Sequence, residues 1–232
     1  MIHLRHRIAM RIVIKVGGSA IAPSLEARRF RGYAEVIKSL AKDHTVLVVV
    51  GGGTPAREYI NVSKELKASN ALRDLIGIGV SRLNARLLIS AMDDAAYPEP
   101  PHDYQEANLA MYSGKIVIMG GVQPGQTTDA VAAILAEYVH ADLLIRTTSV
   151  DGVYTADPRV DKDARKIDRM TPQELLELVT KMEMTAGANN IFDMLGAQII
   201  KRSRIPMIVV NGHEPKNIID AVNGKPIGTL IK

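Results

Sequence analysis

Glycine-rich turns that follow short apolar segments are the part of this sequence with the clearest chemical meaning. They lie at residues 17–18, 51–53 and 120–125. A backbone N–H in such a turn can approach a ligand closely because glycine has no Cβ, and a helix that begins there adds free N–H donors. Each turn alone is more typical of a tight strand-to-helix connection. Three together favour phosphate-binding sites, two of them at the expected helix starts in residues 51–55 and 125–129.

Lys15 is the charged residue best placed to act with these turns. It lies near the end of the first expected strand, just before the turn at residues 17–18. Phosphoryl transfer accumulates negative charge on the oxygens of the moving group, so an ammonium between two bound phosphates would stabilise it. The alternative is a strand-end lysine that reaches water, the commoner fate of lysines. Arg57, in the helix after the triple glycine, is equally typical of a second site cation and of a solvated surface residue.

The residues that would support other chemistries are missing. The chain has no cysteine, which excludes thiolate nucleophiles and cysteine metal sites and is compatible with a reducing cytoplasm. Its six histidines are scattered and form no H-E-x-x-H pair, so we expect no metal site built from protein ligands. Neither a Walker A loop nor a G-x-G-x-x-G fingerprint occurs. Transfer to a phosphate monoester would need no protein base, because the second pKa of such an acceptor is about 6.

Length and composition indicate an ordinary globular domain. The chain has 232 residues, of which 47% are hydrophobic and 23% charged, the balance of a chain that folds. With 4% aromatic residues and no tryptophan, it offers few stacking platforms for nucleic acid. Its longest apolar runs fall far short of the roughly 20 residues of a membrane span. We therefore expect neither a nucleic-acid nor a membrane partner.

The first nine residues form a basic leader. Arg5 and Arg7 in it contribute two of the net +4 charges, so the remainder is close to neutral. The leader lacks the apolar core of a signal peptide. We expect the folded domain to begin at about Met10.

Short β-branched segments alternate with longer segments of helical period, which is typical of an α/β fold. Strands are expected at residues 11–16, 45–50, 115–119, 142–147 and 207–210, each apolar nearly throughout. Helices are expected at residues 25–41, 55–66, 72–92, 129–139, 171–184, 194–203 and 215–222. We predict a three-layer αβα sandwich with a mainly parallel central sheet, built by one domain over residues 10–232.

Four segments together make this sequence resemble the amino acid kinase superfamily, and within it the archaeal-type uridylate (UMP) kinases. They are K-V-G-G-S at residues 15–19, V-V-G-G-G-T-P-A-R at 49–57, G-G-V-Q-P-G-Q-T-T-D-A at 120–130 and T-S-V-D-G-V-Y-T-A-D-P at 148–158. The V-D-G-V-Y run is shared across the superfamily. The P-G-Q-T-T-D-A run and R-D-L-I-G at residues 73–77 are more specific to the uridylate branch.

The resemblance implies an amino acid kinase-like fold and transfer of the γ-phosphate of ATP to UMP, giving UDP and ADP in pyrimidine nucleotide biosynthesis. It implies a UMP-binding lobe at about residues 10–140 and an ATP-binding lobe at about residues 141–232. It further implies Mg²⁺ held mainly by the nucleotide phosphates, and a cytoplasmic homohexamer built as a trimer of dimers.

The same resemblance implies roles for individual residues. Lys15 would stabilise the transferring group. The residues expected to bind ATP are Gly18, Ser19, Gly53, Arg57, Thr148, Tyr154 and Asp157. Those expected to bind UMP are Gly52, then Asp74 at the ribose hydroxyls, and the loop of Val122, Gln123, Pro124, Gly125, Gln126, Thr127 and Thr128.

Two departures and two alternatives stay open. Gln198 stands where relatives often carry a lysine, and Ser149 where they often carry an asparagine, so Gln198 receives no catalytic role. One alternative is a molybdate or tungstate storage protein on the same fold. The other is a different kinase of the superfamily; the isopentenyl phosphate branch is disfavoured, because residues 54–57 lack its histidine. Lys15 and the acceptor loop favour an enzyme over a storage protein.

Overall fold

The computed structural model describes residues 9–183 and 192–232. The basic leader, apart from residue 9, and the expected end of the helix at residues 171–184 lie outside the described part of the chain. The described residues form a seven-stranded sheet in which the order differs from the order in sequence. Across it lie β3 (Val117–Met119), β2 (Thr45–Val50), β1 (Arg11–Val16), β4 (Leu143–Thr148), β8 (Met207–Asn211), β9 (Thr229–Ile231) and β7 (Arg169–Met170).

Neighbouring strands run parallel except β8 and β9, which are antiparallel. The predicted mainly parallel sheet is therefore confirmed. The short strands β5 (Val153–Tyr154) and β6 (Lys166–Ile167) pair antiparallel outside this sheet. They were not expected from the sequence, because a two-residue strand carries too few side chains to show a period.

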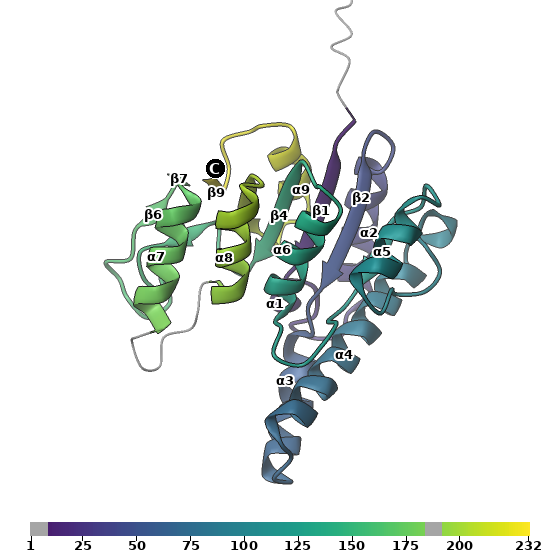
Figure 1. Ribbon diagram of the computed structural model, residues 1–232, viewed down its shortest axis with the longest axis horizontal. Helices are drawn as coiled ribbons and strands as arrows, with labels where there is room; N and C mark the ends of the chain where they lie inside the picture. Colours follow the sequence, from purple (N-terminus) through teal and green to yellow (C-terminus); the bar gives the residue numbers. More distant parts are fainter. Residues whose placement is uncertain (1–8, 184–191) are drawn as a thin grey trace, which may run out of the picture.

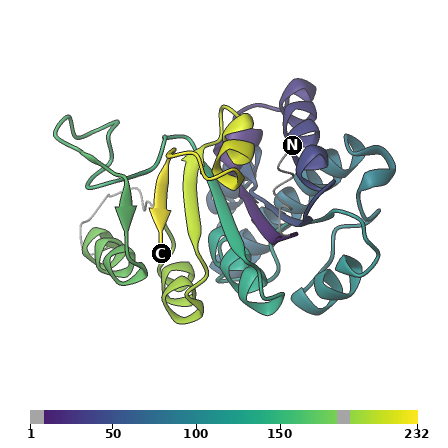
Figure 2. The ribbon, with the colours of Figure 1, turned by 90° about the horizontal axis from the view of Figure 1, so that it is seen from above.

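Helices cover both faces of the sheet, as seen along its edge in Figure 2. One core cluster joins the sheet to α1 (Gly18–Ile21), α2 (Ala27–Leu40), α4 (Asn70–Ser90) and α9 (Lys216–Val222). The other joins it to α5 (Tyr104–Met111), α6 (Thr128–Tyr138), α7 (Pro172–Glu183) and α8 (Met194–Ser203). This is the predicted three-layer αβα sandwich.

The alternation of side chains along β1 decides which residue meets which helix layer. Ile12, Ile14 and Val16 point into the cluster with α2 and α4, and Val13 points into the cluster with α6 and α8. Lys15 has the parity of Val13, so it leaves the sheet on the α6 side. All of these residues are buried because the strand is covered on both faces.

The helix α3 (Gly53–Glu65) packs against α4, and the pair projects from the body of the molecule in Figure 1. Apolar side chains remain exposed along this hairpin: Tyr59, Val62, Leu66, Leu72, Leu75, Leu83 and Leu87. No helix in the described parts of the chain has both the length and the hydropathy of a membrane span.

Local capping explains where the elements differ from expectation. A capping box opens α7, with the Thr171 amide donating to Glu174 and the Glu174 amide donating to Thr171 Oγ1 at 3.2 Å. Helix α2 begins two residues later than predicted, and Ser24 does not cap it, because the Ser24 hydroxyl donates to Glu26. Helix α5 was missed; Asp103 caps it by accepting from the Glu106 amide at 2.8 Å. A further short 3₁₀ turn spans Asp93–Ala95.

Candidate active site

The candidate site lies at the carboxyl ends of β1 and β4. The chain builds β1, β2 and β3 toward one edge of the sheet and then adds β4 and β8 on the other side of β1. Loops that leave two adjacent strands in opposite directions open a crevice at such a switch point, where ligands bind in α/β sheets. The turn at residues 17–18 and the segment after Thr148 both start there.

Three charged side chains meet on the α6 side of this point. Lys15 Nζ lies 3.0 Å from Asp129 Oδ1. Arg146 forks onto the same carboxylate, with Nε 2.8 Å from Oδ1 and Nη2 3.2 Å from Oδ2. Lys15 and Arg146 are register partners on β1 and β4, so their side chains leave the sheet side by side. Asp129, in the first turn of α6, lies between them.

Burial controls the electrostatics of this cluster. The side chains of Lys15 and Arg146 are 9% exposed and that of Asp129 is 15% exposed. Desolvation lowers the pKa of Lys15, and the nearby charge of Asp129 opposes that shift. Burial alone would raise the pKa of Asp129, but Arg146 and Lys15 outweigh it and hold that pKa well below its usual range. The carboxylate is therefore ionised at neutral pH.

The start of α8 closes the cluster from the side. Asp193 caps this helix by accepting from the Gly196 amide at 2.9 Å, and it also accepts the hydroxyl of Thr127, the N-cap residue of α6. Burial lowers the pKa of Lys15, and the negative charge of Asp193 acts in the opposite direction with a smaller effect. Phe192 lies under Arg146, with the guanidinium carbon 5.2 Å from the ring centroid. The N-termini of α6 and α8 thus meet beside Lys15.

The first two glycine turns pack backbone against backbone. A Cβ on Gly18 would lie 2.1 Å from the Gly53 amide nitrogen, and one on Gly53 would lie 2.4 Å from the Ala22 carbonyl oxygen. Gly53 also has a φ of +70°, which disfavours any residue with a side chain. These glycines are required by the close approach of the two turns, whether or not a ligand binds there.

Two buried polar residues of α4 hold the glycine turns in place. The side-chain amide of Asn84 donates to the carbonyls of Gly51 and Gly52 at 2.9 and 3.0 Å. The hydroxyl of Ser81 accepts from the Gly121 amide at 2.8 Å. Both side chains are only 2% exposed. One helix therefore sets the positions of two turns that are about 70 residues apart in the sequence.

The loop of residues 122–128 is fastened at three points. The Gly125 amide donates to Asp74 Oδ2 at 2.9 Å, which ties the loop to α4. The hydroxyl of Tyr104 donates to Gln126 Oε1 at 2.8 Å, which ties it to α5. Thr127 caps α6 by accepting from the Ala130 amide at 3.2 Å. Of this loop, Gln123, Pro124, Gly125 and Thr127 are exposed, and Val122, Gln126 and Thr128 are half-buried.

The residues expected to bind ATP lie in several elements. Ser19 is half-buried in α1, and exposed Arg57 in α3 donates to Thr54 Oγ1 at 2.9 Å. The Thr148 carbonyl accepts from the Gly212 amide at 2.7 Å. Tyr154 donates its hydroxyl to Asp151 at 2.6 Å, and Asp157 receives the fork of Arg159 at 2.8 and 2.9 Å. Lys15 is tied to the loop of residues 122–128 through its ion pair with Asp129, the residue that follows this loop. The residues expected to bind ATP have no such ion pair or hydrogen bond to Lys15 among those of the described residues.

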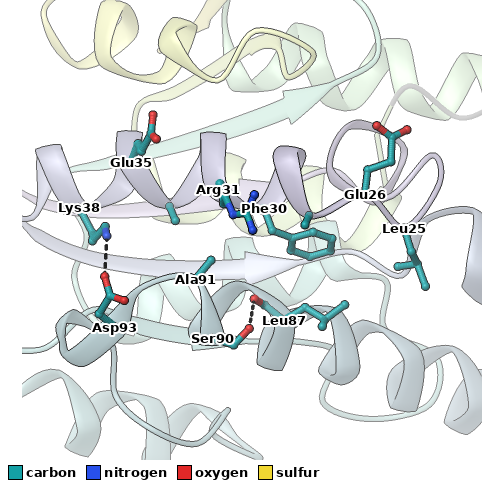
Figure 3. A pocket seen from close by; sticks show the side chains of 12 residues that line it. Leu25, Glu26, Phe30, Arg31, Glu35, Lys38, Leu87, Ser90, Ala91 and Asp93 are labelled. Carbon is teal, nitrogen blue, oxygen red and sulfur yellow. Dashed lines mark hydrogen bonds and ion pairs between the residues drawn. The ribbon is translucent and has the colours of Figure 1, made fainter.

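A groove lies elsewhere, between α2 and α4. It has a volume of about 660 Å³ and lies on the face of the sheet away from Lys15. Its floor includes Phe30 and Leu87, and Lys38 bridges its rim to Asp93 at 3.1 Å (Figure 3). None of the predicted site residues lines it.

A model of the amino acid kinase family matches residues 10–211. The chain belongs to the amino acid kinase family. It is 75% identical, over 96% of its length and 100% of the relative, to a protein named uridylate kinase from Methanocella arvoryzae. It is 48% identical, over 96% of its length and 99% of the relative, to one of the same name from Methanobrevibacter smithii. The crystal structure of uridylate kinase from Archaeoglobus fulgidus superposes with a TM-score of 0.88 at 47% identity, covering 96% and 100% of the two chains.

In this amino acid kinase family member, four residues that form or support the site were not predicted as functional. They are Asp129, Arg146, Asp193 and Asn84. Asp129 lies inside a recognised motif, so its sequence context offered a signal. Arg146 follows three apolar residues of β4 and places a charge inside the strand, which was a second signal. Asp193 and Asn84 offered none, because helix caps and buried amides resemble ordinary polar residues in a sequence.

The described parts of this family member contain no group of three or more His, Cys, Asp or Glu side chains that could hold a metal ion. Gln198, for which the sequence predicts no catalytic role, is exposed on α8. Half-buried Ser149 follows β4 directly.

Proposed function

We propose that this protein is a nucleoside monophosphate kinase that transfers the γ-phosphoryl group of ATP to UMP. The observation that carries the proposal is the buried cluster of Lys15, Asp129 and Arg146 at the switch point of the sheet. It carries a net positive charge beside a helix N-terminus, which suits an anionic phosphoryl group in transit. We assign UMP as the acceptor from the relatives named uridylate kinase, one of which is 75% identical to this chain.

The proposed reaction needs positioning and charge, and no base. An oxygen of the UMP phosphate attacks the γ-phosphorus of ATP as the bond to the β–γ bridging oxygen breaks, and that electron pair leaves with ADP. The acceptor is already ionised at neutral pH, since its second pKa is about 6. Lys15 would meet the equatorial oxygens of the moving group, where negative charge accumulates. Its buried ammonium is strengthened as a partner by the low local polarity.

We propose that UMP occupies the lobe of residues 10–140. Asp74 and the loop of residues 122–128 would bind it, with Gly52 at its phosphate. The Asp74 bond to Gly125 supports this assignment, since it brings the expected ribose acceptor to the expected base-binding loop.

We propose that ATP occupies the lobe of residues 141–232, with its phosphates reaching across to the glycine turns. The phosphates would meet Gly18, Ser19, Gly53 and Arg57, and the nucleoside would lie along Thr148, Tyr154 and Asp157. The packing of Gly18 on Gly53 supports a single phosphate-binding surface made by two turns.

Mg²⁺ would neutralise the ATP phosphates. Both oxygens of Asp129 already accept hydrogen bonds or ion pairs from Lys15 and Arg146, and both oxygens of Asp193 accept from protein donors. This donor set fits an ion that takes its ligands mainly from the nucleotide and water, as Mg²⁺ commonly does.

A coupled ADP-release assay over a panel of nucleoside monophosphates, with and without Mg²⁺, tests the proposal. We expect Mg²⁺-dependent turnover with UMP well above that with AMP, GMP or CMP. Absence of UMP turnover would overturn the proposal. Absence of turnover together with co-purified molybdate or tungstate would favour an oxoanion storage protein, and turnover with another phosphate acceptor would favour a different kinase of the family.

We also propose a cytoplasmic homohexamer. The exposed apolar side chains of the α3–α4 hairpin support self-association, because exposed apolar residues gathered on one element are typical of interaction surfaces. Light scattering after gel filtration should give a mass near six chains. Leu75→Glu should lower that mass, whereas Tyr112→Glu, at a more exposed apolar position on the other layer, should not.

A further inference from the structure

Arg146 is a buried arginine at the centre of the molecule whose charge the proposed reaction does not itself use. It interrupts β4, a strand whose preceding residues Leu143 to Ile145 are buried and apolar. A guanidinium is costly to bury unless it is paired and hydrogen-bonded. Its cost is offset here by two hydrogen bonds to Asp129, at 2.8 and 3.2 Å, and by the face of Phe192.

The charges of the cluster show what this arrangement does. Asp129 carries one negative charge and lies between two cations, Lys15 and Arg146. Without Arg146, Lys15 and Asp129 would form a neutral pair. With it, the Asp129 carboxylate is shared between two cations, so Lys15, Asp129 and Arg146 together keep one net positive charge. That surplus is available to an anion at Lys15. Asp193 acts on Lys15 from the side and accepts from Thr127 and the Gly196 amide.

The geometry of Arg146 also restricts Asp129. A bidentate fork holds both carboxylate oxygens and so defines the plane of the group. Phe192 restrains the guanidinium from its face. Asp129 then presents Oδ1 to Lys15 in one orientation, and the lysine keeps its other N–H groups for a ligand.

We propose that Arg146 is a positioning residue of the phosphoryl-transfer site: it shares and orients the Asp129 carboxylate, so that this carboxylate does not cancel the charge that Lys15 directs toward the moving phosphoryl group. The inference rests on the proposed function, because it assigns Lys15 to that group. It adds a second site cation that is supplied by the sheet, on the strand next to Lys15.

Arg146→Gln and Arg146→Lys test the proposal. Gln removes the charge, whereas Lys keeps the charge without the fork. We expect kcat with UMP to fall about 30-fold for Gln and less for Lys, while KM for UMP and ATP stays within about 3-fold. Thermal unfolding checks that each variant folds. The Arg146→Lys variant still tests the proposal if the Arg146→Gln variant does not fold. The matched control is Arg202→Gln, which breaks an exposed arginine fork on Glu137.

The protonation of Lys15 is the readout that a purely structural role would not move. Asp129, Arg146 and Asp193 are the charged groups that act on it. Loss of the Arg146 charge should raise the pKa of Lys15 and move the alkaline limb of kcat to higher pH, and Arg146→Lys should not. The ¹³Cε resonance of Lys15, assigned with Lys15→Met, reports the same shift without turnover.

The outcomes separate the two proposals. A wild-type chain without UMP turnover overturns the proposed function, and the ¹³Cε titration still tests the effect of Arg146 on Lys15. A folded Arg146→Gln variant with kcat within about 3-fold of wild type overturns the role of Arg146. Equal losses in the Gln and Lys variants, with an unmoved Lys15 titration, also overturn it and leave Arg146 as a packing residue.

Discussion

The carboxylate of Asp74 accepts a 2.9 Å hydrogen bond from the backbone amide of Gly125. The two residues are 51 positions apart in the sequence, and the bond ties the first turns of α4 to the loop before α6. Gly125 has a φ of +80° with open space around its α-carbon, so this loop adopts a conformation that glycine permits and other residues disfavour. A helix carboxylate and a glycine turn thus form one wall of the expected UMP site.

Asp74→Asn should weaken UMP binding. The amide can still accept from Gly125 but loses the negative charge and one acceptor for ribose hydroxyls. We expect KM for UMP to rise about 10-fold with a smaller change in kcat, because the contact lies away from the transferring phosphorus. Steady-state kinetics at saturating ATP measures both. Asp43→Asn, on the exposed turn after α2, is the control, and an unchanged KM in Asp74→Asn would contradict the ribose assignment.

Lys15→Met should remove most of the catalysis. Methionine fills a similar volume, and Asp129 keeps its fork from Arg146, so the fold should persist. We expect kcat to fall by about 100-fold, a loss of about 3 kcal/mol of transition-state stabilisation, with nearly unchanged UMP affinity. Stopped-time assays and calorimetric titration of UMP measure the two quantities. Lys38→Met, on the rim of the α2–α4 groove, should behave as wild type; equal rates in both variants would exclude Lys15 from the mechanism.

The pH dependence of kcat should report Lys15. Burial lowers its pKa and Asp129 opposes the shift. The active form is the charged one, so activity should be lost as pH rises through that lowered pKa, below the value of about 10.4 for a free lysine. Rates at saturating substrates from pH 6 to pH 10 measure the limb. Lys15→Arg keeps its charge across this range, and its profile should lack the limb; an identical limb in both proteins would assign it to another group.

Asn84→Asp should destabilise the glycine turns. The side-chain amide donates to the carbonyls of Gly51 and Gly52, and a buried carboxylate would instead face two acceptors. We expect a loss of about 2 to 4 kcal/mol in the free energy of unfolding at pH 7. The loss should shrink at acid pH, where the carboxyl is protonated and can donate. Urea unfolding at pH 7 and pH 4.5 measures it, with Asn223→Asp after α9 as control; equal stability of Asn84→Asp and wild type at both pH values would contradict the role of Asn84.

Local sequence determined the five strands at the centre of the fold (β1, β2, β3, β4 and β8), most helices and the glycine turns. Apolar β-branched runs mark strands covered on both faces, and a Thr-x-x-Glu box marks the start of α7, because these signals depend on neighbours along the chain. Lys15 was identified in the same way, from its place before a glycine turn. These features follow from backbone propensity and side-chain period, which a sequence displays directly.

Tertiary structure decided which distant residues act together. Arg146 meets Lys15 only because β1 and β4 are neighbours in the register that pairs them. Asn84 reaches the triple glycine across more than 30 positions, and Asp193 reaches Thr127 across 66. Strand order and helix packing set these contacts, and both arise from burial summed over the whole chain rather than from any local pattern. The sequence therefore determined the parts of the site, and the packing of the sheet decided their partners.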